Sequence, residues 1–86
     1  MPIISRFFGI VIRMFFNEHA PPHFHAEYAE HRAVIDIRAL QVTDGKLPRR
    51  ALELVLDWAE LHQEELLNDW DLCQQHHQPA GIPPLE

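Results

Sequence analysis

The sequence is poor in cysteine and glycine and lacks any long apolar run. It has one cysteine, Cys73, and three glycines in 86 residues, so no intrachain disulfide can form. Paired CxxC motifs, zinc-finger spacings, glycine-rich phosphate loops and serine elbows are missing, which sets aside the classes built on them. The apolar opening is interrupted by Arg13, has no cleavage pattern and is too short for a bilayer. We therefore expect a cytoplasmic protein with no membrane span.

Basic residues are scarce as well. Seven Lys and Arg face thirteen Asp and Glu, which gives a formal net charge of −6. Such a surface repels phosphate backbones, so general binding to RNA or to anionic membranes is disfavoured. Histidine is the exception, with seven copies in a short chain. Because imidazole titrates near neutral pH, acidification would carry the net charge past zero and change the partners that the surface favours.

Alternating apolar and polar residues predict an antiparallel sheet of three to four strands in the N-terminal half. We expect strands over residues 9–16, 23–28 and 32–38, and a short edge strand over 40–42 before an Asp44-Gly45 turn. One face is apolar and is expected to form the core: Ile10, Ile12, Met14, Phe24, Ala26, Ile35 and Ile37. The opposite face carries the other side chains: Arg13, Phe15, His23, His25, Glu27, Asp36 and Arg38.

Residues 48–75 predict one long amphipathic helix, with Pro48 in its first turn and no Gly or Pro between 49 and 78. The expected fold is therefore α+β, an antiparallel sheet followed by one long C-terminal helix packed on one face. We expect one domain over residues 1–77 and a Pro-rich tail over 78–86.

A helix of that length has a geometric consequence. It would be about 42 Å long, whereas a compact domain of this size is roughly 30 Å across. An unbroken helix would overhang the sheet with four apolar side chains, Leu66, Leu67, Trp70 and Leu72, and a protein partner would have to cover them. The alternative is a break near Gln63 that returns the last turns to the sheet.

The residues best suited to chemistry are His23 and His25, which lie two apart on a predicted strand and so point to the same side. They could bind a metal such as zinc, with His19 or Glu27 as a third ligand. They could instead act as general acid and base, with Arg13 or Arg38 holding a phosphate. A third reading is an exposed polar face on which the histidines only make hydrogen bonds.

His62 lies in the middle of the apolar stripe of the predicted helix. We expect it to be a core histidine with one satisfied ring nitrogen. If the helix covered the other face of the sheet, His62 would instead join the His23 and His25 cluster.

Three segments carry specific motifs. They are Met-Pro-x-Ile-Ser-Arg-Phe-Phe-Gly-Ile-Val-Ile-Arg-Met at 1–14, His-x-Pro-Pro-His-Phe-His-Ala-Glu-Tyr at 19–28, and Leu-Pro-Arg-Arg-Ala-Leu-x-Leu-Val-Leu-x-Trp-Ala-Glu-Leu-His at 47–62. With them the chain resembles a small bacterial family of unknown function, numbered 4160. Its members are often encoded beside a second unknown-function family, numbered 2442, in pairs proposed as toxin–antitoxin modules. The resemblance implies a paired gene and a protein partner, and it supplies no catalytic mechanism.

Three functions follow as hypotheses. The first is a component of a toxin–antitoxin-like two-gene module that acts through protein–protein interaction. The second is a ribonuclease-type toxin that uses His23 and His25 with Arg13, although the acidic surface argues against it. The third is a metal-binding regulatory module with a site of His19, His23 and His25.

Overall fold

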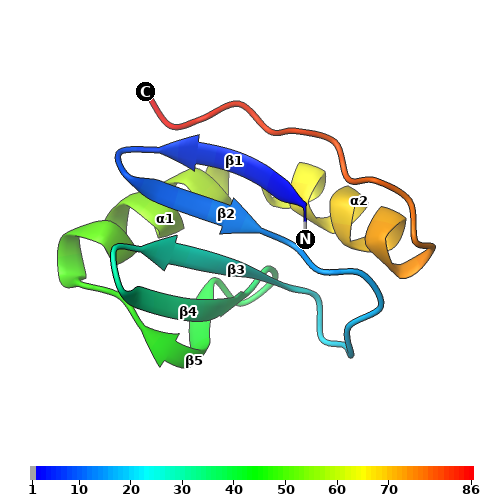
Figure 1. The fold of residues 1–86 in the computed structure, drawn as a ribbon, viewed down its shortest axis with the longest axis horizontal. Coiled ribbons are helices and arrows are strands. Elements are labelled where there is room, and N and C mark those ends of the chain that lie inside the picture. Colours follow the sequence, from blue (N-terminus) through cyan, green and yellow to red (C-terminus); the bar gives the residue numbers. More distant parts are fainter. Residues whose placement is uncertain (1) are drawn as a thin grey trace.

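The computed structural model describes residues 2–86 and shows one antiparallel sheet followed by two helices (Figure 1). The strands are β1 (Ile3–Phe7), β2 (Ile10–Arg13), β3 (His23–Tyr28), β4 (His31–Asp36) and β5 (Gln41–Lys46). They lie in the sheet in their order along the chain, each antiparallel to its neighbour. The helices α1 (Arg49–Leu61) and α2 (Gln63–Gln74) follow. The predicted α+β class is confirmed.

The sheet has five strands rather than the three to four predicted. Strand β1 was missed because the register shifts between Ile3 and Ser5. Ile4 and Ser5 are consequently both buried, and the alternation that marks a strand is lost. Strand β5 continues through the predicted Asp44-Gly45 turn, and a second register shift lies opposite Val34 and Ile35.

The prediction of one long helix is wrong, and the alternative of a break near Gln63 is the one observed. The helix ends at Leu61, because His62 has φ −124° and ψ 24°, outside the helical region. The side chain of Gln63 then donates to the carbonyl of Ile37 at 2.8 Å, which ties the break to the end of the sheet. In Figure 1, α1 lies behind the sheet and α2 lies past the ends of β1 and β2, beside the β2–β3 loop. The longest dimension of the molecule is 33 Å, which is shorter than the unbroken helix of about 42 Å would be.

The residues expected to contact a protein partner are mostly buried within the chain itself. Leu66 and Trp70 are 0% and 6% exposed in the core, and Leu67 is partly buried against it. Leu72 is half-buried. Leu66, Trp70 and part of Leu67 therefore belong to the chain's own core.

The core lies on the predicted face of the sheet. All seven predicted core residues are at most 1% exposed, and they pack against the buried stripe of both helices. Trp58 is central, with its ring centroid 5.3 Å from that of Phe7 and 5.9 Å from that of Phe24. Both helices contribute buried residues to this core. On the opposite face, Trp70 of α2 lies against His23 at the start of β3.

The Pro-rich segment after α2 packs along β1 and reaches the core (Figure 1). The amide of Ile82 donates to the carbonyl of Ile4 at 2.8 Å, and Ile82 itself is 5% exposed. The indole of Trp58 donates to the carbonyl of Pro83 at 2.9 Å. These contacts cover the β1 edge of the sheet and leave β5 as the uncovered edge strand. No helix in the described part of the chain is both long and apolar enough for a membrane span.

Candidate metal centre

His23 and His25 point to the face of the sheet opposite the core. Phe24 and Ala26, which alternate with them on β3, are fully buried on the other face. The prediction that both imidazoles lie on one face is confirmed. Their Nε2 atoms approach the same carboxylate oxygen, Oε1 of Glu18, at 3.0 Å for His23 and 2.8 Å for His25.

Glu18 belongs to the loop between β2 and β3, and the end of α2 holds this loop in place. The side-chain amide of Gln74 donates to the carbonyl of Glu18 at 2.7 Å. One residue earlier, the amide of Asn17 donates to the carbonyl of Cys73 at 3.4 Å. The carboxylate is therefore positioned by residues more than fifty places away in the sequence.

The hydrogen bonds of His23 bear on which of its two ring nitrogens carries a proton. Its Nδ1 lies 2.9 Å from the carbonyl oxygen of Pro21, which can only accept, so Nδ1 carries a proton. In a neutral ring Nε2 then bears a lone pair, and this lone pair faces the Glu18 oxygen at 3.0 Å. Two acceptors at that distance repel unless a proton or a metal cation lies between them. Histidine ligands of metals commonly show this pattern, with the far nitrogen donating to a backbone carbonyl.

Aromatic neighbours fix both rings. The ring of Phe15 packs edge-on against His25 with centroids 4.3 Å apart, and Trp70 of α2 lies 5.0 Å from His23. The three polar side chains still contact solvent, with exposed fractions of 15% for His23, 22% for His25 and 30% for Glu18. The group is thus held by packing while one side stays open to a ligand.

The charge state of Glu18 is set by two opposing effects. Burial by itself would raise the pKa of the carboxyl, but hydrogen bonds and charge from His25 and His23 outweigh it and lower the pKa below its usual value. Glu18 is therefore ionised near neutral pH, as a metal ligand must be.

The ligand atoms are close enough to share one ion. Donor atoms of Glu18, His23 and His25 lie within 4.8 Å of one another. Two ligand atoms about 2.1 Å from a metal lie about 3.0 Å apart at a 90° angle and about 3.4 Å apart at the tetrahedral angle. Contacts of 2.8 and 3.0 Å therefore need to open by about 0.6 Å at most to reach these separations.

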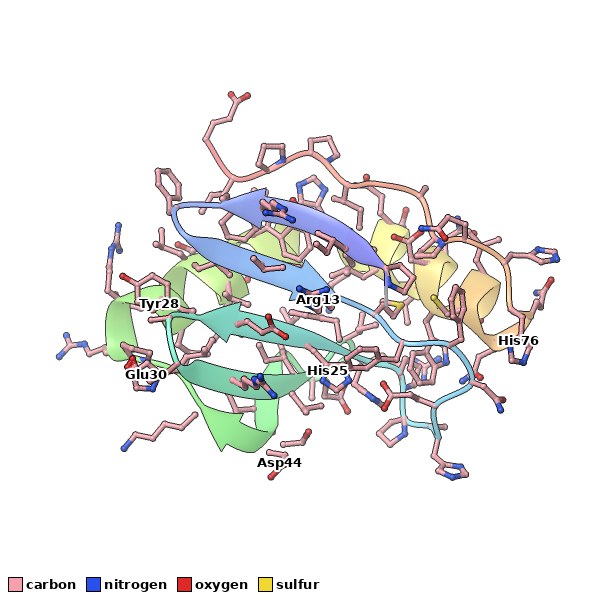
Figure 2. The ribbon with its side chains drawn as sticks, viewed as in Figure 1. Arg13, His25, Tyr28, Glu30, Asp44 and His76 are labelled. Carbon is pink, nitrogen blue, oxygen red and sulfur yellow. The ribbon has the colours of Figure 1, made fainter. Side chains whose placement is uncertain are left out.

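The structure brings together only part of the predicted site. His19, the expected third ligand, is exposed and lies outside the group, and its place is taken by the neighbouring Glu18. Arg13, the expected phosphate ligand, lies opposite His25 on β2 (Figure 2), and its Nε pairs with Glu27 at 3.2 Å. Sequence reasoning missed Glu18 because loop conformation, not strand period, decides which residue faces the histidines.

His62 lies at the break between the helices and is not part of the group. Its Nδ1 bonds the carboxylate of Glu65 at 2.6 Å, and its ring is 5.5 Å from that of Trp58. One ring nitrogen is satisfied, as expected, but the side chain is 17% exposed rather than fully in the core.

Comparison with known proteins identifies a family and nothing closer. Residues 9–71 match the model of DUF4160, a domain of unknown function. The matched segment spans most of the chain and contains Glu18, His23 and His25, so the chain belongs to this family. No curated protein and no solved structure matches it.

Proposed function

We propose that this member of the DUF4160 family binds a divalent transition metal through Glu18, His23 and His25, with zinc as the ion of choice for a test. The observation that carries the proposal is the convergence of two Nε2 atoms on one carboxylate oxygen. It is supported by the backbone acceptor of His23, which in the neutral ring leaves the Nε2 lone pair facing that convergence point. Imidazole and carboxylate together suit Zn²⁺ and the other late first-row ions.

The donor set determines what such a centre could do. Two neutral imidazoles and one carboxylate fill three positions, and a divalent ion then keeps at least one position for water or a ligand. Structural zinc sites are instead closed by four protein ligands. We therefore infer a metal centre that binds or activates an exogenous molecule, rather than one that only stabilises the fold.

The ribonuclease hypothesis receives less support. A general acid and a general base need ring nitrogens that reach the substrate separately, whereas both Nε2 atoms here face one carboxylate. Arg13 is engaged with Glu27, and the net charge of −6 opposes RNA.

A protein partner from a toxin–antitoxin-like gene pair is a separate proposal, motivated by the paired-gene context of the family. Since Leu66 and Trp70 are buried, a partner would have to use other apolar side chains. Among residues 2–86 the large exposed apolar side chains are Phe8, Phe16 and Leu61, and Phe8 and Leu61 are the most exposed of the three, at 60% and 70%. Co-purification with the neighbouring gene product, and its loss in a Phe8→Ser, Leu61→Ser double variant, tests this proposal.

Metal binding is tested by zinc-dependent thermal stability. Zinc at 100 times its Kd would stabilise the native state by about 2.7 kcal/mol, or roughly 10 °C or more in Tm for a domain this small. Glu18→Ala and His25→Ala should each remove most of this rise. His19→Ala is the matched control, because it removes an exposed histidine next to the group and should keep the full rise.

Two results would reject the proposal. One is an unchanged Tm of the parent protein in excess zinc. The other is a rise that His19→Ala abolishes and Glu18→Ala preserves, which would return the site to the ligands expected from sequence. The comparison uses the zinc-induced change for each variant, because Glu18→Ala also removes two hydrogen bonds and lowers the starting Tm.

A further inference from the structure

The face of the sheet opposite the core is laid out in rows across the strands. In one row His25 of β3 lies opposite Val34 of β4, which lies opposite Asp44 of β5. In the next row Arg32 of β4 lies between Glu27 and Lys46. Cross-strand partners lie about 5 Å apart, so these side chains form one continuous surface beside the proposed metal centre.

A hollow of about 250 Å³ lies on this surface. Its lining is made by side chains of the two rows and by the backbone next to them: His25, Arg32, Ala33, Val34, Asp44 and Gly45. The short Val34 lies between His25 and Asp44 in the first row, and all three belong to this lining. Figure 2 shows His25 on β3 and Asp44 at the outer strand, on opposite sides of β4.

Gly45 also fixes the shape of this hollow. It has φ +75°, and a Cβ placed there would lie 2.3 Å from the carbonyl oxygen of Arg32. The two strands therefore approach more closely at this point than any other residue would permit. The close backbone contact between Gly45 and Arg32 therefore fixes the part of the lining that includes Arg32 and Asp44.

The charges around the hollow suit a ligand with two different polar groups. Arg32 makes no ion pair within residues 2–86, and its cross-strand partner Lys46 adds a second cation. Asp44 provides a carboxylate that can accept hydrogen bonds from the opposite wall. His25 belongs both to the hollow and to the proposed metal group, so a molecule in the hollow would contact a side chain that also binds the ion.

Electrostatics of the ion point in the same direction. A divalent cation held by one carboxylate and two neutral imidazoles carries a net charge of +1, which an anionic ligand neutralises. At about 250 Å³ the hollow is below the usual range for drug-sized ligands, about 300–1,000 Å³, and so suits a small molecule.

We propose that the hollow over Val34 binds a small carboxylate that also carries a hydroxyl or amino group. One end of the ligand reaches the metal beside His25, the carboxylate meets the guanidinium of Arg32, and Asp44 accepts a hydrogen bond from the hydroxyl or amino group. This inference rests on the proposed metal centre and assigns to it a class of ligand.

The test uses the whole protein loaded with Co²⁺, whose visible absorption reports ligands that enter the metal's coordination shell. L-Malate is the probe, succinate is the probe without the hydroxyl, and inorganic phosphate is the alternative anion. Arg32→Ala should weaken L-malate binding about tenfold or more, as expected for the loss of a charged hydrogen bond. Asp44→Ala should abolish the preference for L-malate over succinate. Arg50→Ala, which removes an exposed arginine of α1, is the control of equal charge and should leave L-malate binding unchanged.

The outcomes separate this inference from the proposed function. If Co²⁺ binds all variants equally but Arg32→Ala binds L-malate as tightly as Arg50→Ala does, the hollow is not the subsite, while the metal centre stands. Phosphate binding that depends on Arg32, without L-malate binding, would overturn the assignment to a carboxylate. If Co²⁺ does not bind the parent protein, both proposals fall together.

Discussion

The buried carboxyl of Asp69 makes a sharp prediction about pH and stability. Asp69 of α2 is 1% exposed, and its Oδ1 accepts a hydrogen bond from the amide of Ala80 at 2.8 Å. Its Oδ2 has no partner among residues 2–86. Burial raises the pKa of Asp69 from 3.8 to about 6, the Ala80 amide partly opposes this, and the charge of Glu65 adds to it.

Protonation of Asp69 in the native state determines how stability changes with pH. Between about pH 4 and pH 6 the native state holds the proton on Asp69 and the unfolded state does not, so stability falls as pH rises through this window. Each tenfold change in proton affinity corresponds to about 1.4 kcal/mol. The rise of the pKa from 3.8 to about 6 on folding therefore lowers the unfolding free energy by about 3 kcal/mol once Asp69 is fully ionised. Asp69→Asn removes the titration and keeps an oxygen for the Ala80 amide.

Urea unfolding of both proteins at pH 4 and pH 7.5 measures this contribution. From pH 4 to pH 7.5, the unfolding free energy of Asp69→Asn should rise by about 2–3 kcal/mol relative to that of the parent protein. The difference between the two proteins cancels the other titrating groups, which both share. A difference in unfolding free energy that is the same at both pH values, or that changes in favour of the parent as pH rises, would refute the reasoning.

Two further changes test the fold. Gly45→Ala should destabilise the protein by more than about 1 kcal/mol, because the new Cβ would lie 2.3 Å from the carbonyl of Arg32; Gly81→Ala, with nothing within 4 Å, is the control, and equal urea midpoints would contradict the described β5. Leu66→Ala should cost about 2–5 kcal/mol as a core truncation, whereas the exposed Leu61→Ala should change the unfolding free energy by less than about 0.5 kcal/mol. A stable Leu66→Ala variant that turns from dimer to monomer in light scattering would instead favour the overhanging helix.

The sheet and its buried face could be predicted because they depend on local alternation. Every predicted core residue is buried, and His23 and His25 share the opposite face, since strand period alone decides both. The same rule failed at β1, where a register shift places Ile4 and Ser5 both inside. A bulge depends on the partner strand, which the local sequence does not reveal.

The helix break and the third ligand depend on contacts between distant residues. The apolar stripe continues without interruption from Val55 through His62 to Trp70, so periodicity predicts one helix. The break follows from the length of the sheet and from Gln63, which bonds the carbonyl of Ile37. The choice of Glu18 over His19 follows from the bond between Gln74 and the Glu18 carbonyl. Neither bond has a signal in the local sequence.

The proposed metal centre requires that Nε2 of His23 and Nε2 of His25 bind the ion. The ring nitrogens of all seven histidines can be followed by two-bond ¹H–¹⁵N NMR spectra during a zinc titration. We predict that after one equivalent only His23 and His25 show coordination, both through Nε2, while Nδ1 of His23 keeps its proton and donates it in a hydrogen bond to the Pro21 carbonyl. Coordination through His19, or equal and gradual shifts of all the histidines with no end point at one equivalent, would contradict the proposed centre.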